Sequence, residues 1–236
     1  EMTHAPTRRC LHLYIDFPEE ATEIAILNAR VPGMDQKLVE DVVHLVQRLL
    51  DEEQFLSPWG IRALSKYHEK NPFSVNIRGI DYKIQYEPGD STSDFFGGNS
   101  NWRGPVWMPV NYIIIQSIRH FGEFYGDELM VECPTGSGIR MNLVQVADEL
   151  TRRLITLFES NAKGERPLHG AHNKFYKNPE NADLVLFYEY FHGESGQGLG
   201  ASHQTGWTAL VAELVHSLSP ELQAKEAEET QRVTEE

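Results

Sequence analysis

Glu189 is the carboxylate of this sequence that is best placed for proton-transfer chemistry. It lies in the aromatic run at residues 187–191, and a segment rich in glycine follows at residues 193–206, before Trp207. Aromatic rings offer flat faces for stacking, and glycine lets backbone approach a ligand closely. A carboxylate among apolar rings can have its pKa raised into a range suited to proton transfer. The pattern predicts a general base, Glu189, that acts on a glycoside.

A second candidate segment is N-W-R-G-P-V-W-M-P-V-N-Y, at residues 101–112. Its two prolines suit the entrance of a helix but not its interior. We therefore expect Trp102, Arg103 and Asn111 near the start of that helix, facing a polar ligand. Trp102 would supply a stacking face and Arg103 a planar donor group. Trp107 is more simply interpreted as a core anchor.

Other residues complete the candidate substrate-binding set or remain open. Trp207, Tyr188 and His203 flank Glu189 and are assigned to substrate binding. Glu194 lies in the glycine segment, where a solvated surface position is expected. The turn at residues 55–65 carries Trp59 and Arg62, and a cleft lining and a packed turn are equally compatible with it.

Neither a metal nor a nucleotide site is predicted. Four histidines, at positions 169, 172, 192 and 203, lack the spacing of a zinc motif and have no cysteine nearby. The segment C-P-T-G-S-G at residues 133–138 lacks the ending of a phosphate-binding loop and is interpreted as a turn. We expect no cofactor.

Composition excludes several classes of partner. The formal net charge is −14 and no basic cluster is present, which argues against nucleic acid and against an anionic membrane surface. No apolar run reaches the ~18 residues of a membrane span, so a soluble protein is expected. The two cysteines, Cys10 and Cys133, form no disulfide framework and permit a reducing compartment. We expect a cytoplasmic protein.

The elements that must position these residues are mainly helical. Apolar spacing predicts a helix from the N-cap Asp35 to about Gln54, a helix opened by Asn142, and a helix at residues 205–217 with Val215 on its buried face. Alternation around Arg78-Gly79 predicts a β-hairpin at residues 75–86, as an isolated β element. Residues 1–34 form a poorly patterned lead-in, residues 35–218 the main domain, and residues 219–236 an acidic tail.

Two motifs give the chain a resemblance to glycoside hydrolase family 63, the group of processing α-glucosidases and mannosylglycerate-hydrolase-like enzymes. Residues 101–112 resemble that family's W-R-G-P-x-W-x-x-x-N-Y segment. Residues 188–211 resemble its carboxy-terminal segment Y-E-Y-(x)n-G-x-G-(x)n-T-G-W-T-A-L-V. The resemblance covers approximately residues 55–217.

The resemblance implies an (α/α)6 toroid, complete or partial, with an inverting mechanism and Glu189 as general base. Inversion uses two carboxyls separated by about 6.5–9.5 Å. The family's acid is an aspartate upstream of the W-R-G-P segment, and its motif is not found here; Asp90 and Asp94 do not match it. We therefore expect this sequence to be the carboxy-terminal part of a catalytic domain whose upstream part is missing, so that the isolated chain would lack the acid.

The expected function is hydrolysis of an α-linked glucoside or mannoside, in an oligosaccharide or a small glycoside. Two alternatives stay open. The first is a non-catalytic carbohydrate-binding or structural remnant that keeps the aromatic cleft. The second is a helical interaction scaffold, which leaves the glycine and aromatic segments unexplained.

Overall fold

The computed structural model describes residues 36–92 and 101–220. The chain divides into two compact units, residues 1–42 and 43–236, and the features below belong to the second unit unless stated otherwise. The lead-in, the predicted N-cap Asp35, Asp94 and residues 221–236 of the acidic tail lie outside the described residues.

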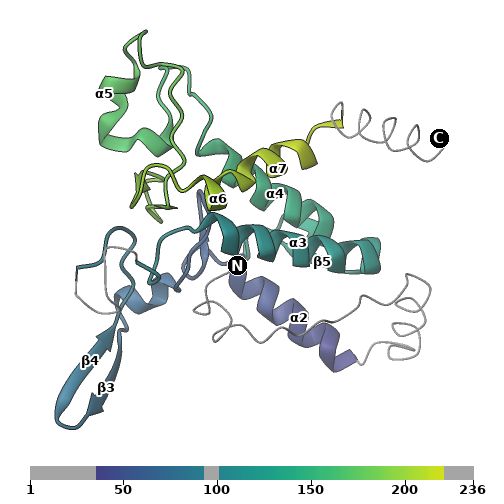
Figure 1. Ribbon diagram of the computed structural model, residues 1–236. Coiled ribbons are helices and arrows are strands. Elements are labelled where there is room, and N and C mark those ends of the chain that lie inside the picture. Colours follow the sequence, from purple (N-terminus) through teal and green to yellow (C-terminus); the bar gives the residue numbers. More distant parts are fainter. Residues whose placement is uncertain (1–35, 93–100, 221–236) are drawn as a thin grey trace, which may run out of the picture. The chain divides into compact units, whose positions relative to one another are not determined.

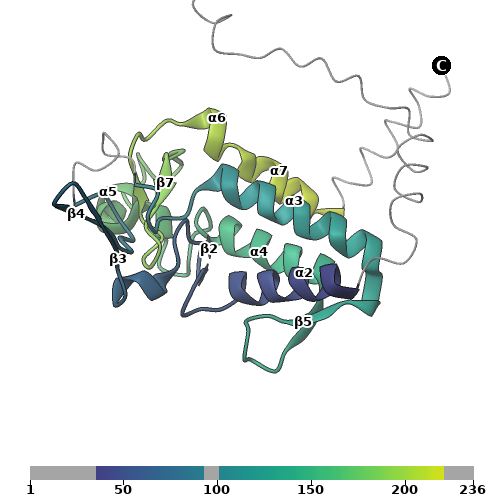
Figure 2. The same ribbon diagram turned by 90° about the horizontal axis from the view of Figure 1, so that it is seen from below.

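Three helices pack against one another in the second unit: α3 (Met108–Tyr125), α4 (Leu143–Thr156) and α7 (Leu210–Ser217). Both views show them side by side (Figures 1 and 2). Helix α2 (Gln36–Leu49) spans the boundary between the units, and the single-turn helices are α5 (Asn173–Tyr176) and α6 (Thr205–Thr208). Three 3₁₀ segments are η1 (Lys66–Glu69), η2 (Gly126–Glu128) and η3 (Pro167–His172).

The strands form four separate two-stranded antiparallel sheets among the described residues. These are β1 (Leu56–Ser57) with β2 (Gly60–Ile61), β3 (Phe73–Ile77) with β4 (Ile80–Ile84), β5 (Met130–Glu132) with β6 (Arg140–Asn142), and β7 (Tyr190–Phe191) with β8 (Gly198–Leu199).

The predicted hairpin at residues 75–86 is present as β3–β4. Its two turn residues, Arg78 and Gly79, have φ of 55° and 82°. Positive φ at both central positions is the geometry that tight hairpins favour. The expectation that this would be the isolated β element is wrong, because three further hairpins join short strands of two or three residues. Strands that short carry no readable alternation in the sequence.

Helix α4 carries the centre of the core, as its apolar spacing predicted. Asn142 caps it through a reciprocal pair of bonds with Gln145: the Gln145 N–H donates to Asn142 Oδ1 at 2.8 Å, and the Asn142 N–H donates to Gln145 Oε1 at 3.0 Å. Its inward residues are fully buried, namely Leu143, Val146, Ala147, Leu150 and Leu154. The cap and the apolar face together fix where α4 starts and which side it buries.

Two predicted helix boundaries are wrong. Helix α2 ends at Leu49 and not near Gln54, because the Asp51 carboxylate accepts hydrogen bonds from the Glu53 N–H and the Gln54 amide and so holds a turn. The helix expected at residues 205–217 is divided at Ala209 into α6 and α7. Val215 was expected on the buried face but is 43% exposed, whereas Val211 and Leu214 are buried.

The fold is thus mainly helical, with small antiparallel hairpins, within the described ranges. That agrees with the expected α-rich class, whereas the closed toroid stays a prediction. No helix within the described residues is both long and apolar enough to cross a membrane.

Candidate active site

The hairpin β7–β8 positions Glu189 immediately before its first strand. Tyr190 pairs with Leu199 across the hairpin. One step beyond that pair, the Glu189 N–H donates to the Ala201 carbonyl at 2.8 Å, and the Ala201 N–H donates to Glu189 Oε2 at 3.2 Å. The half-buried carboxylate is therefore held by backbone at the open end of the hairpin.

Gly200 brings the Glu189 carboxylate and the Tyr190 ring together. Its φ is 70°, and a Cβ at this position would lie 2.6 Å from Glu189 Oε2 and 2.8 Å from Tyr190 Cε1. Only a residue without a side chain fits both the conformation and the space. The glycine segment therefore serves here to bring backbone against the candidate base.

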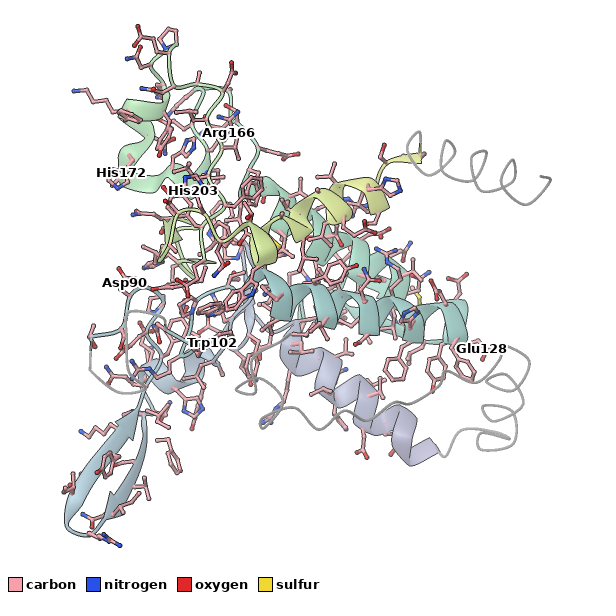
Figure 3. All side chains as sticks on the ribbon, in the orientation of Figure 1. Asp90, Trp102, Glu128, Arg166, His172 and His203 are labelled. Carbon is pink, nitrogen blue, oxygen red and sulfur yellow. The ribbon has the colours of Figure 1, made fainter. Side chains whose placement is uncertain are left out.

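A cluster of stacked rings extends from Tyr190. Its ring lies 4.7 Å from that of Trp107, which stacks on Trp102 at 3.7 Å with planes only 5° apart. The Trp207 ring lies 6.3 Å from that of Trp102 in an edge-to-face arrangement and 5.7 Å from that of Trp107 in a tilted one. Trp107 is 1% exposed, as expected of a core anchor, whereas Trp102 is 48% exposed. Trp102 therefore offers a supported indole face at the surface near the beginning of α3 (Figure 3).

Asp90 joins this cluster, although its sequence context gave no reason to select it as a site residue. The Tyr190 hydroxyl donates to Asp90 Oδ1 at 2.6 Å. Burial, together with this bond to a carboxylate, raises the pKa of Tyr190 well above its ordinary value. Figure 3 labels both Asp90 and Trp102, and the Asn101 amide, adjacent to Trp102, donates to the Gly89 carbonyl at 2.7 Å. A carboxylate thus lies beside the aromatic cluster.

The structure places Arg103 and Asn111 in the interior. Arg103 is 6% exposed, and its guanidinium contacts Glu87 Oε2 at 2.8 Å and Ser91 Oγ at 2.5 Å. Asn111 is fully buried in the first turns of α3. Its amide accepts from the Ile61 N–H at 2.7 Å and donates to the Ile61 and Trp107 carbonyls at 3.0 Å. Both side chains connect backbone segments around the Trp102 platform.

Tyr188 and His203 lie on the segments that flank the hairpin. The Tyr188 ring packs on Gly198, where a Cβ would be only 2.1 Å from it. Burial and a hydrogen bond with Tyr176 raise the pKa of Tyr188 to about 12. His203 is exposed, and its backbone bridges to that of Phe187. The structure thus gathers Glu189, Trp102 and Trp207 around one cluster, with Tyr188 and His203 at its margin.

Glu194 is exposed at the surface, as expected, but its carboxylate is also paired, which was not predicted. Its carboxylate contacts Arg62 at 3.0 Å and Lys66 at 3.2 Å, and accepts from the Tyr86 hydroxyl at 2.6 Å. Burial by itself would raise the pKa of Glu194, but the Tyr86 hydrogen bond and the charges of Arg62 and Lys66 outweigh it and lower the pKa. The sequence offered one signal, the arginine in the turn at residues 55–65, but not its partner 132 residues away.

Metal-binding geometry is not found in the described part of the chain. There, no group of three or more His, Cys, Asp or Glu side chains lies close enough together to hold an ion.

Comparison with known proteins defines the class. The family model of the mannosylglycerate hydrolase MGH1-like glycoside hydrolase domain matches residues 22–208. The chain therefore belongs to this glycoside hydrolase family, in agreement with the resemblance to glycoside hydrolase family 63.

Several relatives of known sequence are yeast proteins. An uncharacterized protein of Saccharomyces cerevisiae is 53% identical over 178 residues, 75% of this chain and 16% of that protein. Mannosyl-oligosaccharide glucosidase of the same yeast is 30% identical over 163 residues, 67% of this chain and 16% of that protein. A probable mannosyl-oligosaccharide glucosidase of Schizosaccharomyces pombe is 23% identical over 173 residues, 72% of this chain and 15% of that protein. The matched part of the chain thus spans about one sixth of these relatives.

Proposed function

We propose that this chain supplies the general-base half of an inverting glycoside hydrolase that acts on an α-linked glucoside or mannoside. Glu189 is the base, and Trp102 is the platform on which a sugar ring stacks. One observation supports the proposal most directly. The Glu189 carboxylate and the Tyr190 ring both lie against Gly200, and the Tyr190 ring stacks on Trp107, which stacks on the exposed Trp102.

In the proposed reaction Glu189 accepts a proton from a water molecule as the water oxygen bonds to the anomeric carbon. The bond between that carbon and the glycosidic oxygen breaks, and the leaving oxygen takes a proton from a carboxylic acid on the opposite face. The separation of about 6.5–9.5 Å between the two carboxyls leaves room for the water. The hydrogen bond from Ala201 fixes one oxygen of Glu189, at 3.2 Å, so that the carboxylate has a defined orientation toward the water.

Arg103 and Asn111 enter the proposal as positioning residues. The Arg103 guanidinium is paired with Glu87, and the Asn111 amide is hydrogen-bonded to the backbone of Ile61. Neither group is therefore directed at a sugar. They act by fixing the segment that carries Trp102 and the start of α3.

The names of the family and of the relatives support the proposed substrate class. Two of the relatives are named mannosyl-oligosaccharide glucosidase, and the family description names mannosylglycerate hydrolase. Both names describe release of a hexose from a glycoside, which favours an α-linked glucoside or mannoside.

The decisive experiment replaces Glu189 by Gln in the full-length gene product. Loss of a general base typically costs 10²–10⁴-fold in rate, so we expect turnover of α-glucosides or α-mannosides to fall at least ~100-fold with an unchanged circular dichroism spectrum. Glu128→Gln, an exposed carboxylate that Figure 3 shows away from the cluster, is the matched control. The product should first appear with the opposite anomeric configuration in a proton NMR time course. Retained activity in Glu189→Gln would remove Glu189 from the mechanism, and retained configuration would remove inversion.

A carbohydrate-binding role without hydrolysis is the second candidate. It is favoured by the Trp102 platform, which is complete within the described residues, whereas the acid has no assigned residue. Calorimetry and a hydrolysis assay on one sample separate the two functions, since binding without turnover supports this one.

A further inference from the structure

A groove of about 480 Å³ lies away from Glu189, at the tip of the β7–β8 hairpin. One wall is Ser195 in the hairpin tip, and the other is the segment that follows α4. The lining residues are Trp59, Thr156, Glu159, Ser160, Asn161, Glu165, Arg166, Pro167, Gly170, Asn173 and Ser195. Its volume is within the range of small-molecule sites.

Trp59 is held with one face covered. A Cβ on Gly196 would lie 2.9 Å from both Cδ2 and Cε2 of the indole, the two atoms shared by its rings. In the plane of the indole, the two fused rings lie on either side of the Cδ2–Cε2 bond. Gly196 must therefore contact this bond from one face of the indole. The indole N–H donates to the Glu194 carbonyl at 3.0 Å. With one face and the N–H engaged, the opposite face is the part of Trp59 that can line the groove.

The second wall is fixed by its own hydrogen bonds. Arg166 Nε donates to the Phe158 carbonyl and Nη1 to the Ala182 carbonyl, each at 3.0 Å. Asn173 accepts from the Arg166 N–H at 3.0 Å and donates to the Gly170 carbonyl at 2.9 Å. The groove is therefore shaped in advance, which lowers the cost of binding.

The chemistry of the groove fits an uncharged polyol. Glu159 and Ser160 are exposed, and within the described ranges their side chains make no hydrogen bond or ion pair, so they are available to hydroxyl groups. Glu165 is paired with Lys177 at 2.6 Å, and the two other charged residues of the lining, Glu159 and Arg166, have opposite signs. A flat apolar face with polar groups around it and no net charge suits a pyranose ring, with its apolar and hydroxylated sides.

Glu189 and this groove lie at opposite ends of the same hairpin. Glu189 pairs with Ala201 at the open end, whereas Ser195 and Gly196 belong to the tip, where the Gly196 N–H donates to the His192 carbonyl. The intervening strand from residue 189 to residue 192 spans about 10 Å at ~3.3 Å per residue. The groove is therefore distinct from the position of Glu189, and none of its lining residues belongs to the cluster of rings around Trp102.

We propose that the groove is a second carbohydrate-binding site, in which a neutral pyranose stacks on Trp59 and donates hydroxyl hydrogen bonds to Glu159 and Ser160. This second site is proposed from the residues that line the groove and does not depend on the role of Glu189. It is testable even if the chain performs no hydrolysis.

The test uses the whole chain with Trp102→Ala and Glu189→Gln, which removes the proposed catalytic site. Methyl α-glucopyranoside, methyl α-mannopyranoside and maltotriose are titrated while the indole N–H signals are followed by ¹⁵N NMR. Trp59→Phe identifies the Trp59 signal. We expect at least one probe to shift that signal saturably, and Ser160→Trp, which fills the groove from an exposed position, to weaken binding at least ~10-fold. Trp59→Phe keeps a stacking ring, and its affinity, measured by calorimetry because the Trp59 signal is lost, should stay within ~3-fold of that of the protein without this substitution.

Each outcome decides the proposal. No shift of the Trp59 signal with any of the three probes overturns it, as does a shift that Ser160→Trp leaves unchanged. If the unmodified protein binds the sugar and the protein with Trp102→Ala and Glu189→Gln does not, the sugar binds at the catalytic site. That result would also overturn the proposal. Absence of hydrolysis in the unmodified protein leaves these results unaffected, so failure of the two proposals can be distinguished.

Discussion

At the scale of single residues, Glu194 shows how a carboxylate in a glycine-rich loop acquires a structural role. It accepts from Tyr86 and pairs with Arg62, whose side chain is 2% exposed, and with Lys66. Arg62 also donates to the Glu52 carbonyl at 3.1 Å and to the Leu56 carbonyl. Because a buried guanidinium without a counter-charge is costly, Glu194 anchors the hairpin tip to the turn at residues 55–65.

Glu194→Gln should therefore destabilise the protein at neutral pH, by about 1–2 kcal/mol, a value discounted because the carboxylate is 36% exposed. The folded-state pKa of Glu194 is lowered, so its contribution is present above the unfolded-state value of ~4.3 and is lost as pH falls through the folded value. The difference in unfolding free energy between wild type and variant should shrink between pH 5 and pH 3 in urea titrations.

Glu159→Gln is the control for this prediction, since an exposed substitution of this kind usually changes stability by less than about 0.5 kcal/mol. An equal loss for Glu194→Gln at pH 7 and pH 3 would show that the charge of Glu194 contributes nothing.

At the scale of elements, the β7–β8 hairpin depends on Gly200. Its φ of 70° is unfavourable for any residue with a side chain, and the space for a Cβ is taken by Glu189 and Tyr190. The hairpin therefore sets the position of the carboxylate through a backbone conformation that only glycine adopts easily.

Gly200→Ala should lower stability by about 1–3 kcal/mol and reduce turnover in the full-length protein by at least ~10-fold, because it displaces the proposed base. Gly136→Ala is matched to it: Gly136 has φ of 83° with no atom within 4 Å of its Cβ position, so it tests backbone strain alone. Thermal unfolding and initial rates are measured for both. Equal activity in the two variants would argue against a positional role for Gly200.

At the scale of the whole second unit, Asn111 joins segments 50 residues apart. Its amide satisfies both the N–H and the carbonyl of Ile61 and also the Trp107 carbonyl. These bonds hold hairpin β1–β2 against the start of α3, where the Trp102 platform begins.

Asn111→Ala should cost about 2–4 kcal/mol, because it leaves two buried backbone groups of Ile61 without partners. Asn111→Asp keeps an acceptor for the Ile61 N–H but loses the amide donors, and it should also destabilise. Ser117→Ala, on the exposed side of α3, should change stability by less than about 0.5 kcal/mol. Urea unfolding measures all three, and a neutral Asn111→Ala would show that the Ile61 bonds contribute no net stability.

The sequence by itself determined the features whose cause is local. The Asn142–Gln145 cap starts α4, Pro109 lies in the first turn of α3, and Arg78-Gly79 makes the β3–β4 turn. Each of these features depends on neighbours a few residues away. The two motifs likewise identified the glycoside hydrolase family.

Only the tertiary structure decided what contacts arise between distant segments. It paired Glu194 with Arg62, buried Arg103 against Glu87 and Asn111 against Ile61, and brought Asp90 to Tyr190. Electrostatic pairing and burial depend on distances in space, and residue spacing along the chain does not encode them across 16 to 132 positions. For the same reason the sequence pointed to Glu189 as a base, while the structure showed which ring, which glycine and which backbone group surround it.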